Sequence, residues 1–441
     1  MDALKQNLIA EARRLRKESE EVALSIGNNP ELPMREERSA ALLQERLVAH
    51  GFRITQQFPL IPNAFVADYG SGGPVIGLLA EYDALPDCGP GGKGPGHGCG
   101  HNLLGAASTF AAIALARVME AQQIPGTVRL FGCPAEETLV GKPYMARDGA
   151  FEGLDACLAW HPGVHNEASS GSGTAMDSLA YEFFGRTAHA AGNPHDGRSA
   201  LDAIEIMNVA VNFLREHVPP QVRLHYAIMD GGKAPNVVPS YARSWYYVRG
   251  TDRPQVAEVS RRVHDCARGA ALATGTRMKR TLLSVCYDRL ANDAIAGALD
   301  ANLKLVGGPK FTKQDRAFAE SLGITGEFDS KVREISTSRG AGSSDEANVS
   351  WIAPLAVLHT ACWAQGTPGH NYLVHLQSVA PAAMKGLAVA VQVLGLTAYD
   401  LLTDAKLLKE AREEFARRTK DFVYDPVLPL RQRAPIQDQI P

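Results

Sequence analysis

Continuous apolar runs alternate with longer amphipathic segments along the first 165 residues. The runs lack the in-out alternation of a half-exposed strand, so they predict strands buried on both faces, over 74–80, 127–133 and 155–160. Apolar residues at helical spacing predict helices over about 1–29, 36–50, 102–121 and 141–149. Strands and helices that alternate in this way are typical of an α/β fold whose mixed sheet is largely parallel and flanked by helices.

The pattern changes near residue 177, where aromatic residues enter the strand-like runs. Strands are predicted over about 178–185, 222–229, 243–250 and 276–287, with helices over about 198–217 and 254–273. We therefore expect a smaller inserted α+β, ferredoxin-like domain at 177–290. The remaining segments, 1–176 and 291–441, would form one discontinuous catalytic domain. The Pro-rich tail after 424 is predicted to be extended or packed as an arm.

The composition argues against nucleic-acid-binding and membrane proteins. The chain has 441 residues, 45% of them hydrophobic, and a net charge of −3, which gives no sign of a nucleic-acid surface or a basic membrane anchor. No continuous apolar stretch reaches 18 residues, so no membrane span is expected, and the charged start does not resemble a signal peptide. A cytoplasmic location follows as the default. Seven cysteines in such a chain are expected to be reduced thiols.

Polar residues follow four of the strand-like runs at the point where each run ends. They are Glu81 and Asp83, the pair Glu136–Glu137, His161, and, after the run that starts at 354, His370. Because strands of an open α/β sheet place functional groups beyond their carboxyl ends, we expect one convergent site. Nitrogen, sulfur and carboxylate donors together indicate a zinc-like metal.

The segment 95–102 (PGHGCGHN) lies between the first two of these runs. Cys99 and His101 are two residues apart, so in an extended segment they point to the same side. Thiolate and imidazole are both good zinc ligands. The alternative is a Gly-rich loop with incidental His and Cys, and His97 could support the site or face the substrate. His375, a neighbour of His370, is a similarly open case.

Two adjacent carboxylates usually belong to a solvated helix start. At a strand end, however, Glu136 and Glu137 can divide the work, one as a metal ligand and the other as the general base that activates water. Asp83 would orient a ligand histidine, or else it is a turn residue before Pro86. From the local sequence alone, His189 is interpreted as a surface residue and Asn236 as a residue that forms a turn.

Eight short motifs occur in an order that matches a known family. They are AEYDALP, GHGCGHN, PAEE, WHPG, GRTAHA, GGKAPNVVP, SSDEANVSW and GTPGH. Over about residues 30–400 the chain resembles the metal-dependent amidohydrolases of zinc-peptidase clan MH, which include aminoacylases, hippurate hydrolases and indole-acetyl-amino-acid hydrolases. It is most similar to the aminobenzoyl-glutamate hydrolase branch. Many hippurate-hydrolase-like members carry Asp where this chain has Asn102.

The resemblance implies a site for two divalent metal ions, Zn or Mn, in each subunit. Its ligands would be Cys99, His101, Glu137, His161 and His370. Cys99 would bridge the two ions, a position that Asp takes in other branches of the clan. Asp83 would then support the site rather than coordinate a metal, and Glu136 would be the general base.

The resemblance also implies that the inserted domain acts as a lid and forms a homodimer or a larger assembly. His189 would reach the partner subunit's site and hold the substrate or the tetrahedral oxyanion. Asn236 would contact the substrate. A substrate carboxylate would need a cationic or amide partner. The candidates in the right domain, most of which are expected to be surface charges, are Arg186, Arg198, Arg243 and Arg249.

The implied activity is a metal-dependent, peptidase-like cleavage of the amide bond in a small N-acyl amino acid. Aminobenzoyl-glutamate and aryl-acyl aspartates are the leading substrates. One alternative is a hydrolytic deaminase of an aromatic amine that uses the same site. Another is a non-catalytic, amide-binding subunit of a hetero-complex, against which the presence of Glu136 and the full ligand set argues.

Overall fold

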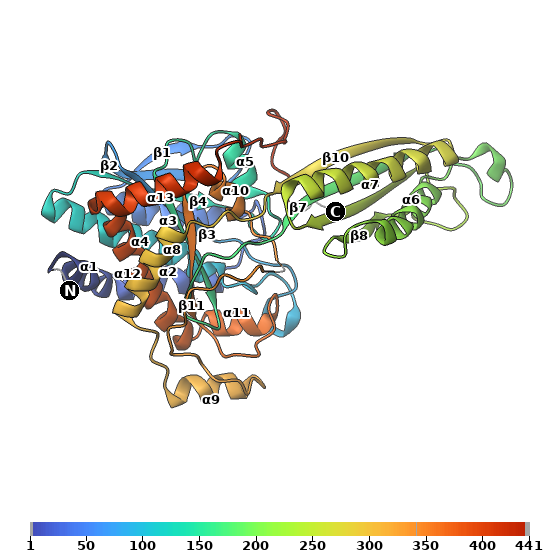
Figure 1. Ribbon diagram of the computed structural model, residues 1–441. Coiled ribbons are helices and arrows are strands. Elements are labelled where there is room, and N and C mark those ends of the chain that lie inside the picture. Colours follow the sequence, from blue (N-terminus) through green and yellow to red (C-terminus); the bar gives the residue numbers. More distant parts are fainter. Residues whose placement is uncertain (1–2, 341, 437–441) are drawn as a thin grey trace.

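The computed structural model describes residues 3–340 and 342–436. The chain forms two bodies, each built around one β-sheet, and the second body extends away from the first (Figure 1). The first sheet has seven strands, in the order β1 (Arg53–Gln57), β2 (Phe65–Ser71), β4 (Gly126–Cys133), β3 (Val75–Glu81), β5 (Ala156–Gly163), β11 (Leu355–Ala361) and β6 (Glu167–Ser169). Its four central strands, from β4 to β11, run parallel, and the flanking strands are antiparallel. The carboxyl ends of the parallel strands therefore meet at one edge.

Long helices cover one face of this sheet and bury its main core. They are α1 (Ala3–Arg14), α2 (Arg16–Asn28), α3 (Glu37–Ala49), α4 (His101–Gln122), α8 (Asp293–Val306), α12 (Pro381–Thr403) and α13 (Ala405–Arg418). The single helix predicted for the first thirty residues is divided at Leu15, which is buried and keeps helical backbone angles. By length and composition α4 and α12 could cross a membrane, but most of each is buried inside the structure, as expected for core helices.

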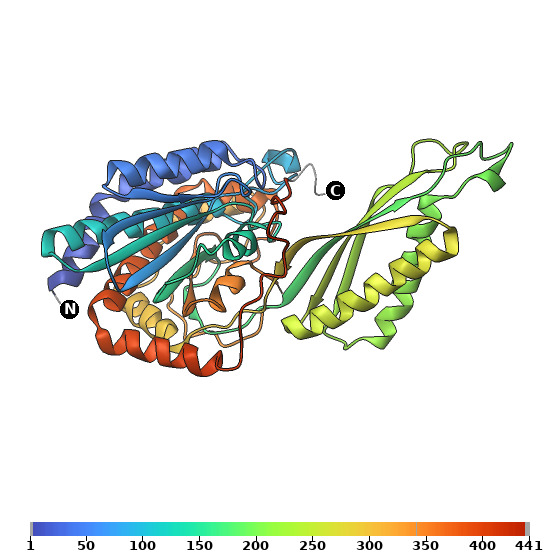
Figure 2. The same ribbon diagram turned by 90° about the horizontal axis from the view of Figure 1, so that it is seen from above.

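Shorter elements pack on the other face and at the carboxyl edge of the first sheet. They are α5 (Gly141–Arg147), α9 (Lys313–Ser321), α10 (Glu346–Ser350), α11 (Tyr372–Ser378) and the 3₁₀ turn η1 (Pro90–Gly92). The segment 419–436 has no regular structure and runs beside the junction of the two bodies (Figure 2). It is held there by Gln432, which donates to the carbonyl of Leu282 at 2.7 Å. Residues 437–441 of the predicted arm lie outside the described residues.

The second sheet is antiparallel, in the order β10 (Arg277–Cys286), β7 (Ala175–Phe184), β9 (Tyr241–Gly250) and β8 (Arg223–Asp230). One face packs on α6 (Ala200–Leu214) and α7 (Arg253–Thr274), with the turns η2 (Pro194–Asp196) and η3 (Arg215–His217) beside them. The chain order β-α-β-β-α-β with this strand order is the ferredoxin-like arrangement. The predicted fold class, a mixed α/β sheet plus a smaller α+β part, is confirmed.

The second body has a near end and a far end. The chain enters the second body at Ala175 of β7, which pairs with Gly250 of β9, and leaves it after Cys286 of β10. The other ends of these strands, and the loops 185–199 and 231–240, therefore lie at the far tip (Figure 1). The isolated bridge between His189 and Val237 joins these two loops. Residues at the near end of β9 therefore lie beside the first sheet, and residues in the two tip loops lie far from it.

Candidate metal centre

The loop before α4 brings Cys99 and His101 to the carboxyl edge of the first sheet. Gly100, between them, has φ +79° and caps α4, which begins at His101. A Cβ at Gly100 would lie 2.9 Å from side-chain atoms of Pro162 and Trp363, so only glycine fits there. The start of α4 also directs backbone N–H groups toward the site, which favours negative charge.

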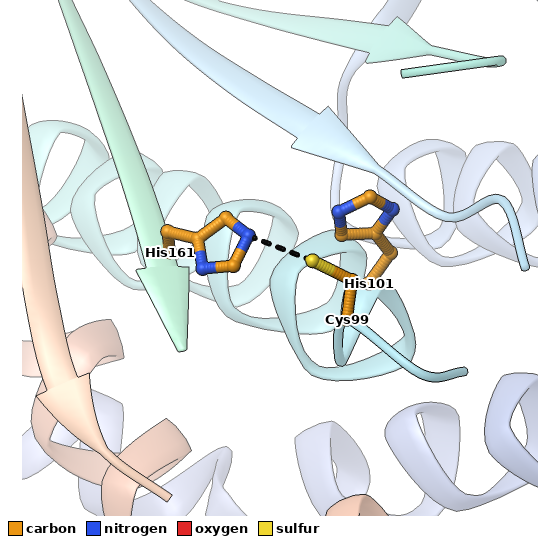
Figure 3. Close-up of side chains that lie close together, drawn as sticks. All are labelled: Cys99, His101 and His161. Carbon is orange, nitrogen blue, oxygen red and sulfur yellow. Dashed lines mark hydrogen bonds between the residues drawn. The ribbon is translucent and has the colours of Figure 1, made fainter. Parts of the chain in front are cut away.

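The five residues that the resemblance assigned as ligands converge in two groups. Donor atoms of Cys99, His101 and His161 lie within 4.8 Å of one another, and so do those of Cys99, Glu137 and His370. Figure 3 shows the first group, in which the Cys99 sulfur faces the ring of His161 from β5 across 3.3 Å (Sγ to Nε2). The two groups share the Cys99 sulfur.

The buried His101 and the half-buried His161 present the same ring nitrogen to the centre. His101 Nδ1 lies 2.9 Å from Asp83 Oδ1, and His161 Nδ1 lies 2.7 Å from the carbonyl of Pro162. Each Nδ1–H therefore donates outward, and each Nε2 is left for a ligand. His101 Nε2 is buried and makes no hydrogen bond within the described residues. Two imidazoles with a shared thiol and a carboxylate suit a divalent, zinc-like ion.

His370 and Glu137 complete the second group. His370 has φ +50° and its backbone N–H donates to the carbonyl of Gly98 at 3.1 Å, which ties this loop to the metal loop. Its Nε2 lies 3.7 Å from Glu137 Oε2, although the side chain is 64% exposed. Asp83 joins the two groups, because its second oxygen accepts the backbone N–H of Glu137 at 2.9 Å.

The side chains of the two groups have pKa values far from their usual ranges, in the directions expected where buried donor groups crowd together. Burial, with Glu137 nearby, raises the pKa of Cys99 to about 12. Burial also raises the pKa of Glu137 to about 8 and lowers that of His161 to about 4. For His101 burial acts in the opposite direction, but Asp83 and Cys99 outweigh it and hold the pKa well above its usual range. A bound cation would stabilise the thiolate and carboxylate forms.

Glu136 sits beside the two groups without belonging to either. Its carboxylate is buried, and one oxygen lies 3.8 Å from His101 Nε2. Burial, and then the neighbouring Glu81, raise its pKa well above the usual range. The preceding residue, Ala135, has φ +56°, and its N–H donates to Glu36 Oε1 at 2.9 Å. Glu36 thus holds the strained turn that aims the Glu136–Glu137 pair.

Sequence reasoning missed Glu36, and it also missed Lys142, which joins Glu81 and Asp345 in a buried ion-pair cluster. Lys142, at the start of α5, contacts Glu81 and Asp345, and its side chain is fully buried. Gly141 allows the start of α5 to pack against Pro134, since a Cβ there would lie 1.8 Å from the carbonyl of Pro134. No local motif marks Glu36 or Lys142, because each is distant in sequence from the groups it supports, whereas Glu81 and Asp345 lie within the motifs AEYDALP and SSDEANVSW. Glu81, at the end of β3, was noted only as a polar strand end.

His97 and His375 lie in neither group. Both side chains are buried, and the backbone N–H of His97 donates to His375 Nδ1 at 3.1 Å. Burial, together with the nearby His101 and His375, lowers the pKa of His97 to about 3. The pair therefore packs behind the metal loop as neutral imidazoles.

The residues expected from the second body are divided between its two ends. Arg249, at the near end of β9, donates to Ser343 Oγ at 3.0 Å, and its charge adds to burial in lowering the pKa of His370. His189 and Asn236 are exposed in the tip loops, where the N–H of Ala190 donates to the carbonyl of Asn236 at 3.0 Å. The structure thus brings Arg249 to the centre of its own chain but not His189 or Asn236.

Comparison with known proteins gives consistent findings. A family model described as peptidase dimerisation domain matches residues 176–274. One of the subunits of the p-aminobenzoyl-glutamate hydrolase of Escherichia coli is 35% identical over 93% of this chain and 94% of its own length. Among solved structures, the aminobenzoyl-glutamate utilization protein of Klebsiella pneumoniae has TM-score 0.64 at 20% identity, covering 88% of this chain and 97% of its own. The YXEP protein of Bacillus subtilis, a dinuclear metal binding peptidase from the M20 family, has TM-score 0.56 at 18% identity, covering 88% and 99%.

Proposed function

The chain belongs to the M20 family of metal-dependent hydrolases, as its resemblance to clan MH predicted, and on this premise we propose that it cleaves the amide bond of an N-(aryl-acyl) amino acid. Aminobenzoyl-glutamate is the first candidate, since the relative with 35% identity is named for that substrate, and aryl-acyl aspartates are the second. The observation that carries the proposal is the pair of donor groups that share Cys99, with Glu136 beside them and in neither of the two.

The ligands of the proposed centre are Cys99, His101 and His161 for one divalent ion, and Cys99, Glu137 and His370 for the other. Two ions, Zn or Mn, bound there would supply Lewis acidity toward the amide carbonyl and would lower the pKa of water. The nitrogen and sulfur donors favour zinc, and the carboxylate of Glu137 is compatible with either metal. Asp83 is a supporting residue in this scheme, because it orients His101 through Nδ1 and Glu137 through its backbone N–H.

Glu136 is the proposed general base. Its buried position and raised pKa make the carboxylate a strong proton acceptor. It takes the proton of the attacking water and then gives it to the nitrogen of the leaving amino acid. The turn held by Glu36 keeps this carboxylate next to the ligand groups but outside them.

His189 is the proposed oxyanion donor. Its Nδ1 accepts the backbone N–H groups of Ala191 and Gly192 at 3.2 and 3.0 Å, so in the neutral ring the proton must reside on Nε2. The Nε2–H group is therefore a preset donor for the developing negative oxygen. Because the tip loops lie far from their own centre, His189 and the adjacent Asn236 would serve the centre of a second subunit (Figure 1).

The second body provides a surface suited to that association. Helix α6 exposes Ile206, Val209 and Phe213 at helical spacing, the last with 70% of its surface exposed. The edge strand β8 exposes Ile228 and Met229. The family model describes this part of the chain as a dimerisation domain, and we propose a homodimer formed through residues 177–290, with 1–176 and 291–441 as the catalytic domain. The Escherichia coli relative is named as one subunit of its hydrolase, which makes a hetero-complex the alternative.

Arg249 is the proposed partner of the substrate carboxylate. Successive side chains of β9 point to opposite faces of the sheet, and every second one is buried against the helices. Arg249, Tyr247 and Trp245 are the intervening residues, so they share the other face. These two rings meet edge to face at 5.1 Å, and the Arg249 guanidinium lies 5.4 Å from the Tyr247 ring. A cation beside two aromatic rings matches an aryl-acyl amino acid. A centre that depends on a free thiol also needs reducing surroundings, and we place the enzyme in the cytoplasm.

The test is an activity screen of the metal-reconstituted protein against N-acyl amino acids and aromatic amines, with products identified by mass spectrometry. Release of glutamate or aspartate from an aryl-acyl substrate supports the proposal. Release of ammonia from aromatic amines alone would replace it with a deaminase. Tight binding of the amides without turnover would replace it with an amide-binding subunit.

A further inference from the structure

A buried ion-pair cluster lies directly behind the proposed metal centre. The Lys142 side chain has no exposed surface, and its Nζ lies 2.6 Å from Glu81 Oε1. Lys142 also contacts Asp345 through its ammonium group, and its backbone N–H donates to Asp345 Oδ2 at 2.9 Å. Asp345 is itself fully buried, so Lys142 is fixed at both its backbone and its side chain.

Glu81 points its second oxygen at a residue of the metal centre. Its Oε2 lies 3.5 Å from His101 Nε2, the atom that the proposed centre uses as a ligand. Donor atoms of Glu81, His101 and Glu136 lie within 4.8 Å of one another, so they form a third group able to hold a divalent ion. This third group is incompatible with the proposed mechanism, because it takes His101 from the Cys99 group and uses Glu136 as a ligand.

We propose that Lys142 is a positioning residue that keeps Glu81 out of the metal coordination. The inference rests on the proposed ligand set. The ammonium group neutralises Glu81 and occupies one of its oxygens in a site without solvent. For Glu81 to coordinate an ion, that pair would have to break where the effective dielectric constant is low and an uncompensated charge is costly. Lys142 thereby leaves His101 to the Cys99 group and leaves Glu136 free to accept a proton.

The geometry predicts a specific pattern among three variants, Lys142→Gln, Glu81→Gln and the double variant. Each is prepared metal-free, loaded with Mn²⁺ or Zn²⁺, dialysed against a weak chelator and analysed for metal content by elemental analysis. Lys142→Gln frees Glu81, so we expect an ion held at least about tenfold more tightly than any in the wild type, with kcat lowered about 100-fold and KM little changed. The double variant should lose the tighter ion and recover most of the kcat, because the freed carboxylate is gone.

Two controls separate this inference from a purely structural role. Lys385→Gln removes a lysine from another partly buried ion pair, with Asp315, and should change neither metal content nor kcat. Glu81→Gln alone should keep metal affinity within about threefold of the wild type, because Glu81 is not a ligand in the proposed centre. This variant tests the inference even if Lys142→Gln does not fold. A large loss of affinity in Glu81→Gln, or a double variant as inactive as Lys142→Gln with unchanged metal content, would overturn the proposal.

The metal content of the wild type tests the underlying ligand set independently. Two ions per subunit in the wild type, with no difference among the Lys142 variants, would refute the role of Lys142 and leave the centre intact. Fewer than two ions in the wild type would instead refute the dinuclear centre.

Discussion

The carboxyl edge of the first sheet and the far tip of the second body both carry proposed catalytic residues, but they are built in opposite ways. At the sheet edge, Glu136, His101 and Asp83 are buried and fixed by contacts from several segments of the chain. At the tip, His189 is exposed, and its ring accepts two backbone N–H groups of its own loop. The proposed ligands and base thus belong to one chain, whereas the proposed oxyanion donor His189 would act at the centre of a second subunit.

This contrast predicts that a change at the sheet edge disables its own subunit and a change at the tip disables its partner. The sharpest single substitution is Glu136→Gln, which removes the proposed base and keeps the side-chain volume. We expect kcat to fall by roughly 10³–10⁴ with metal content unchanged, since Glu136 lies outside both ligand groups. Steady-state kinetics and elemental analysis check both parts. The neighbouring substitution Glu137→Gln is the matched control and should lose metal as well as activity.

The tip is tested by His189→Ala, which removes the proposed oxyanion donor. We expect kcat to fall about 10²–10³-fold with full metal content. Mixing this variant with Glu136→Gln should restore roughly a quarter of the wild-type activity, because half of the dimers are mixed and one of their two sites is intact. The exposed His195 lies in the same loop, and His195→Ala should have little effect. Full activity in His189→Ala, or no recovery on mixing, would contradict a role in the partner subunit.

The same contrast separates what the sequence predicted from what it did not. The apolar runs predicted β3, β4 and β5, and the residues after them predicted where a site would lie, because strand burial and strand ends are encoded locally. The resemblance supplied the ligand set, and the structure gathers those five side chains. Glu36 and Lys142 were not predicted, since their roles depend on packing between segments about 100 and 200 residues apart: Glu36 with Ala135, and Lys142 with Asp345.

The tip illustrates a different limit. His189 and Asn236 were placed in the inserted domain, but sequence could not show that they lie at the end farthest from the first sheet while Arg249 lies at the near end. That division follows from the antiparallel register of β7 with β9, which pairs Ala175 with Gly250 at the near end. Within one chain Arg249 therefore lies apart from His189 and Asn236, and the proposed second subunit would bring the three residues to one centre.

A smaller effect is expected from Asp83→Asn at the sheet edge. The amide keeps the shape of the carboxylate but weakens the hydrogen bond that orients His101 and removes its charge. Metal affinity should fall about 10–100-fold, and excess metal should recover most of the activity. A titration of metal-free protein with a competing chromophoric chelator measures the loss. Asp68→Asn, which removes a carboxylate paired with Arg129 elsewhere on the sheet, should leave the affinity unchanged.

The mildest test varies only the pH. Burial raises the pKa of Cys99 to about 12 and that of Glu137 to about 8 in the metal-free chain, so both groups carry protons at pH 7. A metal ion must displace these protons, and affinity should rise with pH between 6 and 8, by about tenfold per pH unit for each proton released. Calorimetry in buffers of different ionisation enthalpy counts the protons. Cys99→Ser should lower the slope, whereas His189→Ala should leave it unchanged, because the tip does not contact the centre of its own chain. Equal slopes for the wild type and Cys99→Ser would remove Cys99 from the ligands.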